Sequence, residues 1–493
     1  MEKSIVIIGA GLAGLSAGCY GQMNGYKTAI FEMHNIAGGV CTAWKRKGYT
    51  IDGAMNWLVG TRHGSQFYNF WEDLGAAQEW RIHNHDQYMI DEGRDGKTFT
   101  IYCNAERFEQ YLRDLAPEDS DPIKEFTQAI RSFANYSMPV DKPVELYDAS
   151  DQEKMGQMLP GMQAMQKWSA ISTTDFAQRL KNPYLRQVFS NFPGLPMSMF
   201  IMVLGLQHSQ SAGYVIGGAL ALVKSIEKRY RKLGGQIYFN SRVAKILVEN
   251  EKAVGIKLTD GREYRADYVI SACDGRTVIF DMLGGKYINE TIKNMYDHPR
   301  LFEPLVHVAL GVKRTFNEIP SSVGGLRFPL NKPINIAGKE EKSLNVFIYN
   351  FDPTLARPGK TLLTVYYNTD YDYWRQLRQD LPRYNSEKER IARDVIAGLE
   401  LRFPGISEQV EMRSVATPVT WERYTGNWRG AYEGWMFGAS DNVSKTLPGL
   451  DNFYMAGQWV NPGGGMPPAV MSGNHTIQFI CHKDTKKFVT AKP

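Results

Sequence analysis

The stretch SIVIIGAGLAG, residues 4–14, decides how the N-terminal part of this chain folds. Residues 4–8 form a short, β-branched apolar run, which is typical of a buried parallel strand. Gly9, Gly11 and Gly14 follow as G-x-G-x-x-G and open a small-residue helix over residues 12–24. The first glycine permits a tight turn, the second lets the backbone approach a pyrophosphate, and the third lets helix and strand pack closely. The stretch therefore predicts a dinucleotide-binding turn at a helix N-terminus.

A second strand over residues 27–32 completes a βαβ unit, and Glu32 closes it. A carboxylate at this place can accept hydrogen bonds from ribose hydroxyls and would repel a 2′-phosphate, so NADP is disfavoured. A tight strand–helix turn without any ligand is the structural alternative, but it does not explain why an acid ends the unit. We therefore predict that this unit binds a dinucleotide.

Further glycines in the chain favour FAD over NAD. Gly38 and Gly39 come soon after Glu32, and a late strand ending at Ala456 precedes Gly457, a triple glycine at residues 463–465 and a further helix. This arrangement resembles the glutathione-reductase-like FAD proteins, in which a second glycine pair lies under the flavin diphosphate. The resemblance implies a helix N-terminus near the flavin pyrimidine ring, which would stabilise negative charge on the reduced flavin.

The C-terminal segment NPGGGMPP, residues 461–468, makes the resemblance more specific. It resembles the flavin signature of phytoene desaturases, carotenoid isomerases and retinol saturases, whose usual form is His-Pro-Gly-Gly-Gly-Val-Pro-Gly. This chain departs from that form at Asn461, Met466 and Pro468. It also has Val40-Cys41 where many members have Arg, which is closer to the saturase and isomerase branches. The resemblance implies FAD, a polyene, carotenoid or other isoprenoid apolar substrate, and peripheral membrane attachment.

These patterns together predict the residues that contact FAD. Most belong to the glycine turns or flank them, and Val243 lies where the family's backbone contacts the adenine end. The predicted cofactor-binding residues are Gly9, Gly11, Ala13, Gly14, Glu32, Met33, Gly38, Gly39, Val40, Val243, Gly457, Gly465, Met466 and Pro467.

The rest of the chain predicts an α/β protein, α+β overall. We expect a glutathione-reductase-like Rossmann FAD domain, a mixed-sheet substrate domain and a helical insertion. An amphipathic helix over residues 217–233 and short strands up to residue 272 return the chain to the FAD domain. The predicted parts are residues 1–117, 212–300 and 431–493 for the FAD domain, 118–211 for the helical insertion that faces substrate or membrane, and 301–430 for the substrate domain.

Composition excludes several classes of function. A net charge of +5 on 493 residues gives no support for nucleic-acid binding. The five cysteines are scattered, without a C-x-x-C pair, so we expect no metal site and no disulfide framework. No run of about 18 apolar residues predicts a transmembrane helix. We expect a cytoplasmic protein with peripheral membrane contact, and no NAD(P)-binding domain of its own, because no second G-x-G-x-x-G follows a strand.

The catalytic residues are not identified by the sequence, because flavin carries the chemistry in such enzymes. His475 is the one acid–base candidate, and we expect it to face away from the flavin on the helix surface. Cys41 is expected to be a small buried thiol, Asp52 to organise a turn and Asp274 to cap a helix. Methionine-rich stretches that include Met155, Met165 and Met197 fit either a channel wall for an apolar ligand or ordinary core packing.

The sequence therefore predicts an FAD-dependent oxidoreductase, a desaturase or a saturase, that acts on a polyene, carotenoid or other isoprenoid. A flavin-dependent cis–trans isomerase of a polyene, without net redox change, is the alternative. An amine oxidase is a more distant alternative, because the aromatic-cage tyrosines of that class are not evident. A non-catalytic flavin-binding protein is the other distant alternative. Substrate identity, reaction direction, electron partner and oligomeric state are left open.

Overall fold

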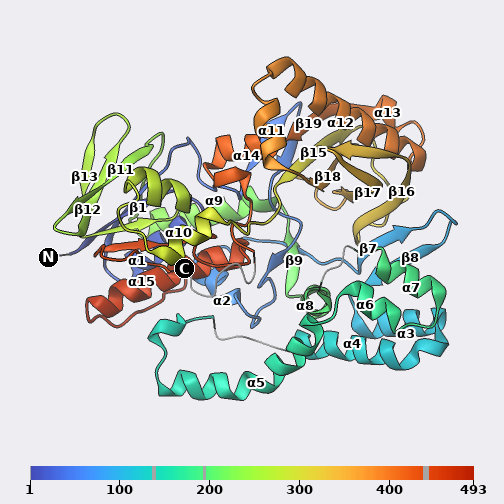
Figure 1. Cartoon of the computed structure of the whole chain (residues 1–493), viewed down its shortest axis with the longest axis horizontal. Helices are drawn as coiled ribbons and strands as arrows, with labels where there is room; N and C mark the ends of the chain where they lie inside the picture. The colour runs from blue at the N-terminus through green and yellow to red at the C-terminus, as the bar shows by residue number, and fades with distance from the viewer. Residues whose placement is uncertain (1, 136–139, 193–195, 437–443) are drawn as a thin grey trace.

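The computed structural model in Figure 1 describes residues 2–135, 140–192, 196–436 and 444–493. The quoted stretch forms strand β1 (Ser4–Ile8) and helix α1 (Leu12–Met23), and strand β2 (Lys27–Phe31) follows, as predicted. These strands lie in a five-stranded sheet of order β10-β2-β1-β14-β20, in which every neighbouring pair is parallel. The three other strands are β10 (Gln236–Tyr238), β14 (Tyr268–Ser271) and β20 (Phe453–Met455).

Helix α15 (Met466–Lys483) packs directly on α1, and both helices lie beside the five-stranded sheet (Figure 1). Small residues make this contact possible, because a Cβ atom on Gly473 would lie 2.4 Å from the carbonyl oxygen of Ala13. Helix α9 (Gly218–Lys232) also packs against α1, and Tyr230 of α9 is fully buried there. Helix α15, at the far end of the sequence, is thereby held against α1 near the N-terminus.

A second, seven-stranded sheet has the order β19-β15-β18-β17-β16-β7-β8. Its pairs are antiparallel except for β16 and β7, which are parallel. Helix α12 (Leu381–Arg402) covers one face through buried Ile391, Val395 and Leu399. The strands are β7 (Gln87–Glu92), β8 (Thr98–Tyr102), β15 (Leu305–Val312), β16 (Val323–Ile336), β17 (Lys339–Ile348), β18 (Thr361–Asn368) and β19 (Val410–Ala416).

The pairing of β7 with β16 differs from the predicted division of the chain. The predicted first part of the FAD domain, residues 1–117, includes residues 87–102, but these residues extend the sheet built from residues 305–416. This pairing joins segments more than 200 residues apart, and no local pattern in the sequence indicates it. The predicted domain boundaries stay predictions.

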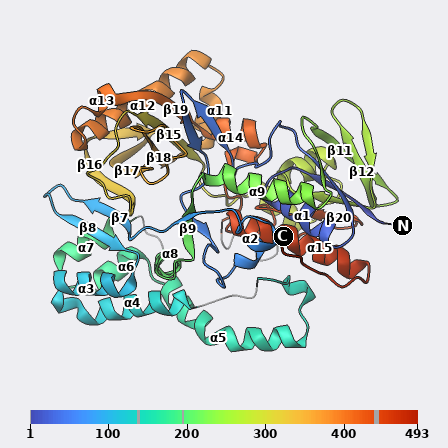
Figure 2. The ribbon, with the colours of Figure 1, turned by 180° about the vertical axis from the view of Figure 1, so that it is seen from behind.

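A layer of helices lies below the second sheet in both views of the ribbon (Figures 1 and 2). Its apolar core includes Phe108, Phe126 and Leu204. Helix α5 runs along the edge of the molecule in both views. The helices are α3 (Ala105–Leu115), α4 (Ser120–Ala134), α5 (Ala149–Ser169), α6 (Thr173–Gln178), α7 (Pro183–Ser190) and α8 (Met197–His208).

Short elements connect these layers. A three-stranded antiparallel sheet of β11, β12 and β13 has a turn at Asp260-Gly261 between its last two strands. A π-helical segment (Thr277–Met282) follows β14. The remaining elements are β3 (Ala43–Arg46), β4 (Tyr49–Asp52), β5 (Leu58–Val59), β6 (Ile82–His83), β9 (Ala212–Val215), β11 (Val243–Glu249), β12 (Lys252–Leu258), β13 (Glu263–Arg265), α2 (Tyr68–Asp73), α10 (Glu290–Asp297), α11 (Tyr371–Leu377), α13 (Ile406–Gln409) and α14 (Pro418–Thr425).

Candidate functional site

The predicted cofactor residues meet at one edge of the five-stranded sheet. Because all its strands are parallel, their carboxyl ends lie at the same edge, which is where open α/β sheets bind ligands. Gly9 follows β1, Glu32 follows β2, and Gly457 follows β20 at this edge. A Cβ atom on Gly457 would lie only 3.6 Å from the Cβ atom of Ala13 in α1. Segments from both ends of the sequence therefore form one cradle.

The N-terminus of α1 is free to receive an anion. Its N-cap residue, Gly11, has no side chain to cap the helix, and its first turn holds no acidic residue. A Cβ atom on Gly11 would find no neighbour closer than 3.9 Å, so the backbone here is open. Gly14 is closed instead, since a Cβ atom there would lie 2.0 Å from the Gly9 carbonyl oxygen. An uncapped, open helix N-terminus fits the pyrophosphate of FAD.

The Glu32 carboxylate is held in place beside this turn. It accepts hydrogen bonds from the backbone N–H of Ala10 (2.8 Å) and of His34 (2.9 Å), and the side chain is buried. Each carboxylate oxygen keeps a further lone pair, because a carboxylate offers about four acceptor positions. The residues present thus fit the adenosine half of a dinucleotide, with the ribose hydroxyls at Glu32.

The second glycine pair lies directly against the first turn. Gly38 donates its backbone N–H to the carbonyl oxygen of Ala10 at 2.9 Å and bridges to Gly11. Gly38 has φ +137°, and a Cβ atom there would lie 2.4 Å from the carbonyl oxygen of Cys41. Only glycine fits this conformation without strain. The two glycine motifs therefore form the two sides of one backbone cradle.

The C-terminal segment closes the cradle. Gly457 donates its N–H to the hydroxyl of Ser472 at 2.7 Å, which ties the end of β20 to α15. Gly465 is the N-cap of α15 with φ +90° and no side-chain cap, and Met466 and Pro467 form its first turn. This second uncapped helix N-terminus agrees with the expected helix beside the flavin pyrimidine ring.

The three remaining predicted residues lie around this cradle. Val243 is buried against Phe31, and its neighbour Ser241 donates a backbone N–H to the Glu32 carbonyl at 2.7 Å. Met33 is partly buried, and Val40 lies between the second glycine pair and Cys41. The roles of all fourteen residues as FAD contacts stay predictions.

An aromatic cluster lies beside the hairpin that follows the second glycine pair. It consists of Trp44, His307, Tyr366 and Trp421, which we call the aromatic box. The His307 ring stacks on Tyr366 at 4.7 Å with an interplanar angle of 6°, and Trp44 and Trp421 lie 5.8 and 6.3 Å from His307 between ring centroids. A Cβ atom on Gly53 would lie 2.9 Å from Trp421 and 3.1 Å from Trp44, so the box touches the hairpin closely.

His307 is a candidate site residue that the sequence did not indicate. It is 1% exposed, yet neither ring nitrogen has a hydrogen-bond partner among the residues that the structure describes. Burial lowers the pKa of His307 to about 3, so the ring is neutral. Buried polar groups in native proteins are almost always paired, and exceptions are explained by strain, by a catalytic role, or by an ordered water or ion. The only available signal was a polar residue inside the otherwise apolar strand β15.

Glu433 is a second candidate that sequence reasoning missed. Cβ atoms on Gly464 and Gly465 would lie within 4.0 Å of atoms of Glu433, so this acid lies against the triple glycine. Burial raises the pKa of Glu433 to about 7. A carboxyl group with a pKa near neutrality can both give and accept a proton at physiological pH. Glu433 is therefore a candidate acid–base group at the flavin end of the cradle.

The prediction that His475 lies on the helix surface is wrong. The residue is 5% exposed, and its Nε2 atom lies 2.7 Å from the carbonyl oxygen of Val140, with which it forms a hydrogen bond. Burial lowers the pKa of His475 to about 4. The chain segment at Val140 covers this face of α15, and a helical pattern alone cannot reveal such a distant cover. This contact gives His475 a packing role.

Three other expectations are confirmed. Asp52 accepts the backbone N–H groups of Ala54, Met55 and Ala219, so it organises a turn and the start of α9. Asp274 accepts the N–H of Thr277, as a helix cap does. Cys41 is buried, and burial raises its pKa to about 12, which makes the thiol inert.

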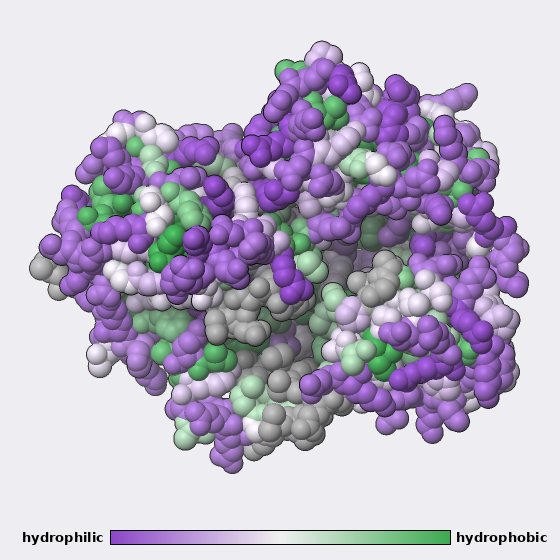
Figure 3. All heavy atoms as spheres, viewed as in Figure 1, coloured by the Kyte–Doolittle hydropathy of each residue, from purple (hydrophilic) through white to green (hydrophobic). Residues whose placement is uncertain are grey.

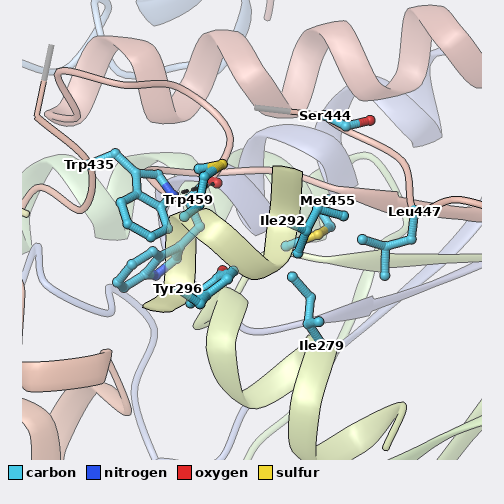
Figure 4. Close-up of a pocket in the computed structure, with 9 residues that line it drawn as sticks. Ile279, Ile292, Tyr296, Trp435, Ser444, Leu447, Met455 and Trp459 are labelled. Carbon is cyan, nitrogen blue, oxygen red and sulfur yellow. Dashed lines mark hydrogen bonds between the residues drawn. The ribbon is translucent and has the colours of Figure 1, made fainter. Parts of the chain in front are cut away.

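Two pockets lie outside the cradle. The first, between the π-helical segment, α10 and the stretch before β20, is apolar (Figure 4). In Figure 4, Ile279, Ile292 and Met455 point toward one another, but the cavity volume is only about 30 Å³. That is space for about one water molecule, which is too little for a long substrate. The second pocket, lined by arginines, is considered below.

Metal ligation has no support in the described part of the chain, where no group of three or more His, Cys, Asp or Glu side chains could hold an ion. The methionine-rich stretches were predicted to form either a channel wall or ordinary core packing. Met197 is fully buried in the helical core, as core packing requires, whereas Met155 and Met165 of α5 are partly exposed. Met162 has a side chain outside the described set.

Comparison with known proteins identifies relatives over nearly the whole chain. The pattern of the family described as "Flavin containing amine oxidoreductase" matches residues 12–476. A phytoene desaturase (lycopene-forming) of Paracoccus sp. is 24% identical, over 97% of each chain. A 4,4'-diaponeurosporene oxygenase of Staphylococcus aureus is 24% identical, over 99% of each chain. The chloroplastic prolycopene isomerase of Daucus carota is 23% identical, over 96% of this chain and 79% of its own.

Solved structures share the fold. An oxidoreductase from Methanosarcina mazei has a TM-score of 0.58 at 17% identity and covers 97% of this chain and 100% of its own. An engineered putrescine oxidase has a TM-score of 0.60 at 13% identity and covers 98% of this chain and 99% of its own. The predicted fold class is thereby confirmed.

Proposed function

The chain belongs to the family of flavin containing amine oxidoreductases and is an enzyme with FAD as its cofactor, and we propose that it acts on a polyene of the carotenoid type as a desaturase or saturase. The observation that carries the proposal is that three relatives spanning nearly the whole chain are named for phytoene, diaponeurosporene and prolycopene. These names describe long, apolar chains of conjugated or isolated double bonds. An enzyme for such a substrate needs a dry, aromatic site.

The residues of the site support this chemistry. Bound FAD supplies two-electron exchange with carbon–hydrogen bonds, which no side chain of the protein can supply. The aromatic box offers flat apolar faces along which a planar polyene can lie. His307 itself is buried, and this burial keeps water away from the ring and keeps it neutral. Glu433 holds or releases the proton that must move when a double bond forms or is reduced.

Product analysis tests the proposal. The purified FAD-loaded protein is incubated with phytoene, lycopene and prolycopene, and the products are separated and weighed by mass spectrometry. Loss or gain of two hydrogen atoms supports a desaturase or a saturase. A changed retention time at unchanged mass identifies the alternative, a cis–trans isomerase. No change with any polyene, alongside turnover of primary amines, would replace the proposal with an amine oxidase.

The surface of the enzyme bears on whether it contacts a membrane. No described helix is long and apolar enough to cross a membrane. The face in Figure 3 is mostly hydrophilic, with small separate apolar patches. We propose that the enzyme makes peripheral contact with a membrane, because the apolar substrate must arrive from a lipid phase. Sedimentation with liposomes tests this contact, and protein that stays in the supernatant contradicts it. We also propose that the chain has no NAD(P)-binding domain of its own.

A further inference from the structure

A second pocket of the structure is lined by residues that neither the FAD cradle nor an apolar substrate explains. It has a volume of about 470 Å³, within the range of small-molecule sites, which is roughly 300–1,000 Å³. Its walls come from the π-helical segment, α10, α11, α14 and the turn after α14. The lining includes Arg276, Tyr296, Tyr371, Arg375, Trp428 and Arg429. We call it the arginine pocket.

The charge of this pocket is positive. The lining residues carry three guanidinium groups and one carboxylate, that of Glu422. This carboxylate already accepts a hydrogen bond from the Tyr371 hydroxyl at 2.7 Å. Arg429 is paired with Asp372 at 2.6 Å, whereas neither Arg276 nor Arg375 has a carboxylate within 4.0 Å among the described residues. Clustered guanidinium groups with free donors are suited to a phosphate, because their planar fork matches its oxygens.

The backbone of the pocket is held in an unusual conformation. Arg429 has φ +57° and ψ +21°, in the left-handed region that non-glycine residues rarely adopt. Its guanidinium lies over the Tyr371 ring, with Cζ 4.9 Å from the ring centroid. The preceding residue, Trp428, is also fixed, because its backbone N–H donates to the Asp274 carboxylate at 2.8 Å. Such conformations persist where the surrounding structure enforces them, and they cluster at ligand sites.

Aromatic rings form the other wall. The Tyr296 and Trp428 rings lie 5.5 Å apart, and Arg276 lies over the Trp428 ring with Cζ 5.8 Å from its centroid. A flat ring system stacks favourably on such faces, and a nucleotide combines that ring with phosphates. We propose that the arginine pocket binds a nucleotide, with its phosphates at Arg276, Arg375 and Arg429 and its base against Tyr296 and Trp428.

This nucleotide is distinct from the adenine nucleotide of FAD. None of the predicted FAD contacts lines the arginine pocket. The FAD cradle has an acid, Glu32, and an uncapped helix N-terminus, whereas this pocket recognises phosphate through side-chain cations. The proposal does not depend on the polyene as the substrate of the enzyme, because it rests on the pocket residues alone.

Calorimetric titration of the FAD-loaded protein tests the proposal, since FAD then occupies the cradle and leaves only the arginine pocket. The probes are ADP, inorganic pyrophosphate and vesicles of phosphatidylglycerol. We expect ADP to bind at least tenfold more tightly than pyrophosphate. Arg276→Gln and Arg375→Gln should each weaken ADP binding at least tenfold. Arg378→Gln is the matched control, because this residue also belongs to the end of α11 but lies over Tyr384.

Other outcomes overturn the proposal. Equal affinity for ADP and pyrophosphate would show that the aromatic wall does not bind the base. Binding of vesicles but not of ADP would show that the arginines contact a lipid surface. Loss of FAD from either arginine variant, measured by flavin absorbance, assigns these arginines to the cofactor. Arg375 is exposed, so the Arg375→Gln variant is expected to fold normally and keeps the test decisive.

Discussion

Glu32 is the residue on which the cofactor end of the site depends most. Its carboxylate fixes the turn at Ala10 and the chain at His34, and we predict that the ribose of FAD binds beside it. We expect Glu32→Gln to weaken FAD binding about 10- to 100-fold, because a hydrogen bond to a charged group contributes about 1.5–3 kcal/mol. Fluorescence of released FAD measures the affinity. Glu249→Gln, an exposed acid on β11, is the control, and an unchanged affinity for Glu32→Gln contradicts the assignment.

His307 and His475 are both buried, but we expect their replacement by phenylalanine to change the free energy of unfolding in opposite directions. His307 has no hydrogen-bond partner in the described part of the chain, whereas His475 is hydrogen-bonded to the Val140 carbonyl oxygen. We expect His307→Phe to preserve or raise the free energy of unfolding, because an unsatisfied buried polar group costs about 1–3 kcal/mol. Polyene turnover should nevertheless fall.

The His475→Phe variant should lose stability instead, because the carbonyl of Val140 is left without its partner. Thermal unfolding and product formation are measured for both variants. A His307→Phe protein that unfolds at lower temperature but turns over polyene normally would show that the residue only packs the core.

The raised pKa of Glu433 predicts a pH dependence with a definite sign. Its folded pKa of about 7 exceeds the ordinary value of 4.5, so the folded state binds the proton more tightly than the unfolded state. The stability that this group contributes is present below pH 4.5 and is lost as the pH rises through 7. We expect Glu433→Gln, which stays neutral, to unfold at a higher temperature than the wild type above pH 7. Thermal scans at pH 5 and pH 8 measure the difference.

The Glu433 carboxyl group should also affect how turnover depends on pH. Glu433→Gln is expected to remove the limb of the turnover–pH profile near pH 7, since the group that titrates there is gone. Identical profiles for the variant and the wild type would remove Glu433 from the reaction.

At the scale of elements, the contact of α1 with α15 joins the two ends of the chain around the cofactor. A Cβ atom on Gly473 would meet the Ala13 carbonyl oxygen at 2.4 Å and the Ala17 nitrogen at 2.7 Å. We expect Gly473→Ala to destabilise the protein by about 1–3 kcal/mol, as overpacking does, and to release FAD. Chemical denaturation and flavin content measure both effects.

Gly156→Ala in α5 is the control for this substitution, because nothing lies within 4 Å of a Cβ atom there. It should stabilise the helix by up to about 1 kcal/mol. Equal effects of the two substitutions on stability and flavin content would show that Gly473 is not needed for the contact between α1 and α15.

The sequence predicts individual elements better than it predicts their partners. The β1–α1–β2 unit follows from glycine spacing and an acid at a fixed place, because both are local requirements of a dinucleotide turn. The parallel pairing of β7 with β16 and the cover over His475 depend on residues far apart in the chain. Those contacts leave no periodic pattern, so the sequence predicted a helix surface where the structure has a buried side chain.

Residues of the candidate site were also missed because their contacts join distant parts of the chain. His307 lies in a strand of apolar residues, where a lone histidine is most often part of the core. Only its unpaired nitrogens and the three rings around it distinguish it. Glu433 lies beside Gly464 and Gly465 in space, although about thirty residues separate them in the chain.

The whole molecule contains a predicted FAD cradle at the edge of a parallel sheet and an aromatic box whose His307 and Tyr366 lie in a second sheet. FAD should stabilise both, because a ligand that binds only the folded state adds to its stability. The family and the fold are established for the whole chain, whereas the polyene substrate is the central proposal.

One measurement tests that proposal most directly. Two samples of the protein, one photoreduced and one with oxidised flavin, are mixed with a polyene without oxygen and followed through the flavin absorbance. We predict that the flavin is reoxidised at the rate at which a polyene with two more hydrogen atoms forms, or that oxidised flavin is bleached as a desaturated product forms. A flavin whose absorbance and redox state stay unchanged by every polyene, in both starting states, would contradict the account.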